Sequence, residues 1–356
     1  MPAAAPAPVN AQVQMRRFRE NTRRHFIQNS TGIFQIDLGQ TYNFDLDKIG
    51  LATGVVLKIG GSITLSAAGA LANQGPWSLL QRVKLKTASG AALLDMTGYD
   101  LYQLNKRMRF GWGPDGAGNF TQHAEVFAAP VAAGVNQWRL HLWVPFSQNR
   151  GSLFEAGIFG LQSNVTQATL EITTTPASGD FVTLFTGEAL TAEVHYEYFE
   201  PPLEGSNVAY PPSYVIKTIT TQYPIVAAGQ QLWEVPRQGI LLDASVILVN
   251  NNLRTDALDF IRFRTNYGDY FEHRILSIDK FLYSLGFGHA ADVGVFNFDF
   301  NSSGDLPFSG DMRDNYNLLK YSKTELDAQI TTGTVITQPA YGRLVTRHWL
   351  PAKVVR

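Results

Sequence analysis

From residue 34 onward, hydrophobic and polar residues alternate along most of the chain. Phe34, Ile36 and Leu38 alternate with polar neighbours, and an apolar run at 55–59 follows soon afterwards. Alternation with a period of two is typical of a β-strand that has one buried face. The pattern predicts first-half strands at 34–38, 42–46, 55–59, 62–65, 82–86, 138–144, 168–174 and 189–198. It predicts second-half strands at 214–219, 231–235, 244–249, 260–265, 295–300, 324–330 and 343–349.

Two segments depart from this alternation and have helical spacing instead. Leu101, Leu104 and Met108 share one face of a helix that we predict over residues 98–108. A counterpart is predicted over residues 278–285, at the corresponding place in the second half of the chain.

A third helix, basic and amphipathic, is predicted before the first strand, over residues 11–28. Its apolar residues recur at helical spacing, and five arginines fill much of the remaining surface. Arginine gains about 1 kcal/mol near anionic lipid headgroups, and apolar side chains can enter the headgroup boundary. We therefore expect the membrane-facing residues to be Met15, Arg16, Arg17, Phe18, Arg19, Arg23, Arg24 and Phe26. A solvated surface helix and a helix on nucleic acid are the alternatives, since arginine binds phosphate without regard to sequence.

The two halves of the chain contain the same unit. Residues 83–90 read VKLKTASG and residues 261–268 read IRFRTNYG, and most positions pair by residue type. Further matches, in the same order, join 39–40 to 229–230, 50–51 to 239–240, and 143–147 to 305–309. A repeat this long exceeds the period of solenoids and propellers. It predicts two tandem domains, and a helix at the same place in both halves supports this interpretation.

Prolines mark the expected boundary between the domains. Pro201, Pro202, Pro211 and Pro212 bracket a segment of Gly, Ser and Asn. Because proline has no N–H to give to a β-ladder, the sheet should stop here. We predict an arm at 1–33, a first domain at 34–200, a linker at 201–212, and a second domain with a tail at 213–356.

Each half holds about seven or eight predicted strands joined by long connections of unequal length. Short, even hairpins would indicate an up-and-down barrel, whereas unequal crossovers favour Greek-key connections. The predicted fold is therefore all-β: two tandem eight-stranded jelly rolls, preceded by a short amphipathic helix.

Composition narrows the function. The chain has no cysteine, which excludes disulfides, thiolate metal sites and thiol catalysis. Its 29 basic and 30 acidic residues nearly balance, so no overall field attracts polyanions and no specific nucleic acid is expected. Charged residues make up 17% of the chain, a low share that suggests surfaces buried in an assembly.

Motifs for catalysis or metal binding are missing. The seven histidines form neither His-x-His nor His-Glu-x-x-His, and the nucleophile elbow and the phosphate-binding loop are absent. The pairs Asp45/Asp47 and Asp311/Asp314 could bind Ca²⁺ or act as acid and base, but such pairs are common. The six tryptophans are too scattered to form a sugar-binding platform. We predict no catalytic, cofactor or metal site.

These features together resemble a known family. A basic N-terminal helix followed by two jelly rolls is similar to the double jelly-roll major capsid proteins. The likeness is greatest to those of tectiviruses, which are bacteriophages with a membrane inside the protein shell. The stretches at 44–46, 49–51 and 54–59 are similar to the opening of that family's first jelly roll.

The resemblance implies a structural protein without enzyme activity or cofactor. It implies a pseudo-hexagonal homotrimer that tiles an icosahedral shell, with the N-terminal helix toward the inner membrane. The implied partners are neighbouring trimers, penton and minor capsid proteins, and membrane lipid. The implied location is the virion, after assembly in the host cytoplasm.

Two other functions stay open at this point. A carbohydrate-binding or carbohydrate-active protein with two β-sandwich domains is the main alternative, although neither an export signal nor cysteine supports it. A phage tail or spike protein is the other.

Overall fold

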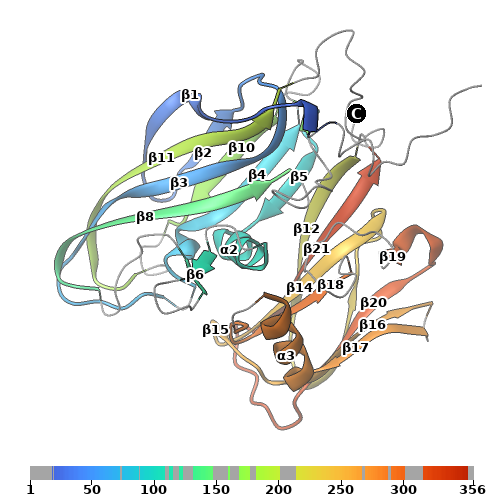
Figure 1. The fold of residues 1–356 in the computed structure, drawn as a ribbon. Helices are drawn as coiled ribbons and strands as arrows, with labels where there is room; N and C mark the ends of the chain where they lie inside the picture. The colour runs from blue at the N-terminus through green and yellow to red at the C-terminus, as the bar shows by residue number, and fades with distance from the viewer. Residues whose placement is uncertain are drawn as a thin grey trace, which may run out of the picture.

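The computed structural model describes most of the chain. The described residues are 18, 20–72, 74–87, 89–108, 112–114, 120–122, 131–146, 159–160, 168–176, 182–200, 214–266, 269–287, 290–300 and 316–351. Their strands form two sandwiches, one from each half of the chain, with a helix between them (Figure 1). No described helix is both long enough and apolar enough to cross a membrane.

The first sandwich consists of two facing sheets. One sheet has the order β1 (Arg24–Ile36), β11 (Phe185–Phe199), β3 (Leu51–Leu65) and β8 (Gly134–Pro145), with β9 (Phe159–Gly160) also on β3. The other has the order β2 (Thr41–Asp45), β10 (Ala168–Thr174), β4 (Leu80–Thr87) and β5 (Ala92–Met96). A short turn of 3-10 helix, η1 (Trp77–Leu79), precedes β4, and a small ribbon pairs β6 (Trp112–Pro114) with β7 (Phe120–Gln122).

The second sandwich repeats this plan. One sheet has the order β12 (Tyr214–Pro224), β21 (Tyr341–Pro351), β14 (Ile240–Asn250) and β15 (Leu253–Arg254), while β18 (Val295–Asp299) and β19 (Tyr316–Asn317) also pair with β14. The other has the order β13 (Gly229–Glu234), β20 (Thr324–Ile330), β16 (Leu258–Thr265) and β17 (Asp269–Ile275). A 3-10 turn, η3 (Leu318–Lys320), precedes β20.

Both sandwiches have jelly-roll topology. If the eight long strands of each are counted along the chain, one sheet joins the first, eighth, third and sixth strands, and the other joins the second, seventh, fourth and fifth. This is the arrangement of two Greek keys. The prediction of two eight-stranded jelly rolls is therefore confirmed.

The sequence repeat coincides with equivalent strands. Residues 83–87 lie in β4 and residues 261–265 in β16, each the third strand of its sheet. The matched Gly50 and Gly239 both have positive φ, 49° and 103°, directly before the third long strand of each jelly roll. A Cβ there would lie 2.5 Å from the Phe199 oxygen and 2.7 Å from the Trp349 oxygen, respectively. Both sites need glycine for the same reason. The match at 305–309 lies outside the described residues.

The helices also occupy equivalent places. Helix α2 (Gly98–Arg107) lies between β5 and β8, and α3 (Leu276–Phe287) lies between β17 and β18. Thr97 caps α2: its hydroxyl accepts from the Asp100 N–H, and the Asp100 carboxylate accepts from the Thr97 N–H. Both helices fall where the sequence predicted them, within two residues at each end.

The predicted N-terminal helix is wrong in its extent. The described helical residues there are Phe18, Glu20 and Asn21, and β1 begins at Arg24. Strand β1 pairs with β11, so the first jelly roll includes residues that the sequence assigned to the arm. The helix prediction failed because residues four apart also lie on the same face of a strand. The pairing of β1 with β11 then overrides the local helix propensity.

Candidate functional site: the junction between the two jelly rolls

Helix α2 forms the junction between the jelly rolls. All ten of its residues are buried, including Lys106 and Arg107. On one side, the Asn105 side chain bonds the backbone N–H and C=O of Trp143 on β8. On the other, the core cluster that holds Leu101 also includes Ile247 and Val345 of the second jelly roll. The two halves are therefore packed as one unit through this helix.

A buried ion cluster ties α2 to the second jelly roll. Arg107 Nη2 lies 3.1 Å from Asp243 Oδ1 on β14, and Arg347 Nε on β21 lies 2.7 Å from Asp243 Oδ2. The three side chains are at most 2% exposed. Burial acts to raise the pKa of Asp243, but Arg347 and Arg107 outweigh it and hold that pKa below its usual range. The carboxylate stays ionised and joins the two halves.

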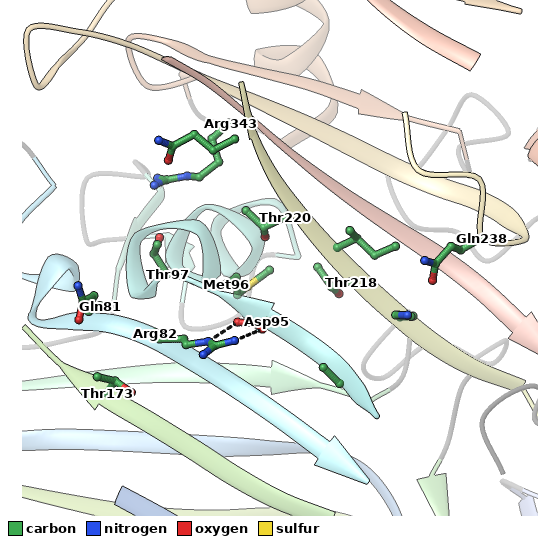
Figure 2. A pocket seen from close by; sticks show the side chains of 14 residues that line it. Gln81, Arg82, Asp95, Met96, Thr97, Thr173, Thr218, Thr220, Gln238 and Arg343 are labelled. Atoms are coloured by element: carbon green, nitrogen blue, oxygen red, sulfur yellow. Dashed lines mark hydrogen bonds and ion pairs between the residues drawn. The ribbon is translucent and has the colours of Figure 1, made fainter. Parts of the chain in front are cut away.

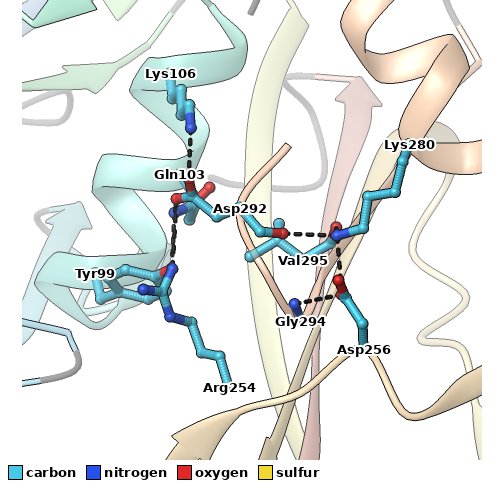
Figure 3. A network of polar contacts seen from close by, with 9 residues as sticks. All are labelled: Tyr99, Gln103, Lys106, Arg254, Asp256, Lys280, Asp292, Gly294 and Val295. Carbon is cyan, nitrogen blue, oxygen red and sulfur yellow. Dashed lines mark hydrogen bonds and ion pairs between the residues drawn. The ribbon is translucent and has the colours of Figure 1, made fainter. Parts of the chain in front are cut away.

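A second polar network reaches α2 through Asp292, in the loop before β18 (Figure 3). Lys106 Nζ lies 2.6 Å from Asp292 Oδ1, and Gln103 Nε2 lies 2.5 Å from Oδ2. Arg254 of β15 donates to the Tyr99 hydroxyl. Burial acts to raise the pKa of Asp292, but Lys106 and Gln103 more than offset it, so that pKa is lowered. Charged groups of α2 are thus neutralised by the other jelly roll.

The Lys280 side chain of α3 supports this network from the second jelly roll. Lys280 Nζ lies 2.6 Å from the Asp292 carbonyl oxygen, 3.0 Å from that of Val295 and 3.1 Å from Asp256 Oδ1. The same Asp256 oxygen accepts from the Gly294 N–H at 2.7 Å (Figure 3). These bonds fix the loop that presents Asp292 to α2.

A groove of about 710 Å³ runs along the junction between β4–β5 and β12 (Figure 2). Arg82 Nε lies 2.7 Å from Asp95 Oδ1 at its rim, and Arg343 Nη2 lies 2.8 Å from Asp100 Oδ1 deeper in the junction. Burial raises the pKa of Asp100, although Arg343 opposes the rise. Because its lining comes from β4 and β5 on one side and β12 on the other, the groove marks the contact between the two jelly rolls.

The residues predicted to face a membrane do not form one helical surface. Phe18 is fully buried, with its ring 5.3 Å from that of Phe199. Arg24 lies in β1 and pairs with Glu197 at 3.1 Å. Phe26, also in β1, is 59% exposed. Arg23 lies in the turn before β1. Met15, Arg16, Arg17 and Arg19 lie outside the described residues.

The acidic pairs have structural contacts where they are described. Asp47 Oδ2 accepts from the Ser30 N–H at 2.8 Å, and Asp45 Oδ1 accepts from the Thr169 hydroxyl at 2.8 Å. Asp311 and Asp314 lie outside the described residues. Within the described ranges, no three histidine, aspartate or glutamate side chains gather closely enough to hold a metal ion.

Single histidines lie in the strands, as the sequence predicted. His141 lies in β8, His195 in β11, His273 in β17 and His348 in β21. His348 is fully buried, with Nε2 2.9 Å from the Thr346 hydroxyl. Burial lowers the pKa of His348 to about 4, so its ring is neutral at pH 7.

Solved structures share this arrangement along almost the whole chain. The STIV major capsid protein matches with 12% identity and a TM-score of 0.64, covering 92% of this chain and 97% of that one. VP54 of PBCV-1 matches with 13% identity and a TM-score of 0.67, covering 92% and 94%. The fold is that of the double jelly-roll major capsid proteins.

A third double jelly roll comes from a bacteriophage. The major capsid protein P2 of bacteriophage PM2 has 13% identity and a TM-score of 0.55, covering 92% of this chain and 97% of that one. No family model and no curated protein matches the sequence.

Sequence reasoning missed the ionic junction of this double jelly roll. One signal was present: residues 240–249 are almost continuously apolar, which is typical of a strand buried on both faces. Asp243 in the middle of such a run needed a buried cation as partner. The partners are Arg347, across the ladder on β21, and Arg107, whose contact depends on the packing of α2 and has no local signal.

Proposed function

We propose that this protein is a viral major capsid protein that assembles as a homotrimer, a pseudo-hexagonal tile of an icosahedral shell. The observation that carries the proposal is the duplicated jelly roll whose halves pack through α2. Two similar halves packed side by side give one third of a six-sided ring, so three copies close it. The fold of viral capsid proteins over 92% of the chain supports the same function.

The proposed role is structural. In the virion the partners are neighbouring trimers, penton proteins and minor capsid proteins, and assembly takes place in the host cytoplasm. The carbohydrate-binding alternative loses support because Trp138, Trp143 and Trp233 are buried, so their rings cannot form a sugar platform.

The end of the molecule at which β1 begins and β21 ends is proposed to face an internal membrane. Strand β1 begins and β21 ends at the same end of the two sandwiches (Figure 1). The sequence beyond these strands is basic at both termini, with Arg16, Arg17 and Arg19 before β1 and Lys353 and Arg356 after β21. Basic residues that adjoin the start of β1 and the end of β21 in the sequence suit anionic headgroups. Phe18 is buried, so the arginines carry this contact.

Liposome flotation of the full chain tests the membrane contact. The protein should float with vesicles that contain anionic lipid and stay behind with zwitterionic vesicles. The triple variant Arg16→Ala/Arg17→Ala/Arg19→Ala should bind at least tenfold more weakly, because each arginine contributes about 1 kcal/mol. The matched control is Arg82→Ala/Lys84→Ala/Arg139→Ala, which removes three positive charges from β4 and β8, away from the start of β1 and the end of β21. Equal losses in both variants would show that only net charge matters, and would contradict the proposed orientation.

Light scattering during size-exclusion chromatography tests the tile itself. The purified chain of 39.4 kDa should elute with three times that mass. A monomer that also binds oligosaccharides would favour the carbohydrate alternative.

A further inference from the structure

The chain already contains one complete contact between jelly rolls. Strand β5 and helix α2 of the first jelly roll lie against the outer face of the sheet formed by β12, β21 and β14 of the second. The outward-facing Ile247, Val249 and Val345 belong to the same core cluster as Leu101 of α2. This contact defines which surface of one jelly roll receives the helix of another.

The equivalent helix of the second jelly roll lacks such a cover in a single chain. Every residue of α2 is buried, whereas α3 and the end of β17 expose an apolar ridge. The ridge consists of Ile275, Ile278, Phe281 and Leu282, which are 48%, 46%, 59% and 39% exposed. Ile278, Phe281 and Leu282 are three and four residues apart on one face of α3. A helix with such a face is normally packed against something.

The equivalent receiving surface lies on the first jelly roll. Strands β1, β11 and β3 correspond to β12, β21 and β14 by their order in the sheet. The two ladders also share a register shift. The β3–β11 ladder has one extra residue on β3, Thr53, and the β14–β21 ladder has one extra residue on β14, Leu242. Counted along the strands from this extra residue, His195 of β11 is equivalent to Val345 of β21.

Part of this receiving face is apolar and uncovered. Phe26 and Ile33 of β1 are 59% and 64% exposed, and Phe26 stacks on His195 with ring centroids 5.5 Å apart. Phe26 was predicted to face a membrane, but its place on the sheet matches a contact between jelly rolls. The exposed apolar residues of β1 and of α3 therefore fall on the two sides of one repeated interface.

The charges at the centre of the receiving face are already paired within the chain. On the receiving face, Lys58 Nζ lies 2.6 Å from Glu193 Oε1, and His195 Nε2 lies 3.2 Å from Glu193 Oε2. On α3, Lys280 pairs with Asp256, while Asp279 is fully buried. An apolar ridge can therefore cover the receiving face without leaving a buried charge unpaired. The contact within the chain differs, because there the charges of α2 pair across it.

We propose that the ridge on β17 and α3 of one copy docks on the outer face of β1, β11 and β3 of a second copy, in the way that β5 and α2 dock within the chain. The occupant is a second copy because the two jelly rolls of one chain already share the α2 contact. This inference rests on the proposed capsid function and assigns residues to its trimer interface. Such a head-to-tail contact closes into a ring when the rotation allows it.

Cross-linking tests the docking directly, because the chain has no cysteine of its own. The double variant Phe26→Cys/Phe281→Cys, treated with a short bis-maleimide, should give covalent dimers and trimers on a denaturing gel. The matched control is Phe26→Cys/Val226→Cys, since Val226 is 80% exposed but lies outside the ridge. The control should remain a monomer band under the same conditions.

A second variant measures the contribution of the ridge. Phe281→Ser removes an exposed side chain, so the thermal unfolding midpoint of the monomer should stay within 2 °C. The dissociation constant of the trimer should rise at least tenfold. If the wild type is trimeric while the double variant fails to cross-link and Phe281→Ser still forms trimers as tightly, the docking is wrong and the capsid proposal stands. If the wild type is monomeric at every concentration, both are wrong.

Discussion

The buried ion cluster at Asp243 gives the most demanding prediction for the junction. Asp243→Asn keeps the size of the side chain but leaves Arg107 and Arg347 buried without their carboxylate. Removing one partner from a buried ion pair costs about 3–5 kcal/mol, since the remaining charge is uncompensated. For a protein of this size, that corresponds to a fall of roughly 5 °C in the thermal unfolding midpoint.

Two other variants make this prediction specific. Arg107→Met should cost less, roughly 1–2 kcal/mol, because Asp243 keeps its 2.7 Å bond from Arg347. Asp95→Asn breaks a pair whose side chains are 45% and 35% exposed, and should cost at most about 1 kcal/mol. Circular dichroism at one pH and one protein concentration gives all three midpoints. If Asp243→Asn unfolds no earlier than Asp95→Asn, the cluster does not hold the junction together.

Two further variants test the interior of the jelly rolls. The buried His348 has a pKa of about 4, below the ordinary 6.5. Between these two pH values the unfolded state binds more protons than the folded state. The free energy of unfolding should therefore fall as the pH drops from 6.5 toward 4. Melting curves from pH 7 to 4 should show a shallower decline for His348→Gln, and equal slopes would contradict the assignment. Gly342→Ala should lower the unfolding free energy by about 1–3 kcal/mol, because its Cβ would lie 2.1 Å from the Trp233 ring. Gly187→Ala, where a Cβ meets nothing within 4 Å, should have little effect in the same denaturant titration.

The sequence predicted the fold well because the fold follows from local and repeated signals. Alternation located most strands, and the glycines at 50 and 239 matched because both copies need a positive φ at the same close approach. The N-terminal helix failed because the spacing of Phe18 and Phe26 is compatible with more than one structure. Pairing to β11, a partner far along the chain, decided between them.

The functional surfaces could be predicted only in part. Apolar residues on α3 look like core in the sequence, and only the packing of the second jelly roll leaves Phe281 uncovered. Similarly, Lys106 and Arg107 look like a solvated helix end, yet both are buried against acidic residues of the other half. Which face of an element meets which partner depends on contacts between distant parts of the chain, and these have no local pattern.

An electron cryo-microscopy map of the purified assembly tests the central claim most directly. We predict three copies around one axis, so that six jelly rolls form a ring in which contacts through α2 alternate with contacts through α3. A particle that contains a single chain would contradict it. So would an assembly in which the two jelly rolls of each chain do not surround a common axis.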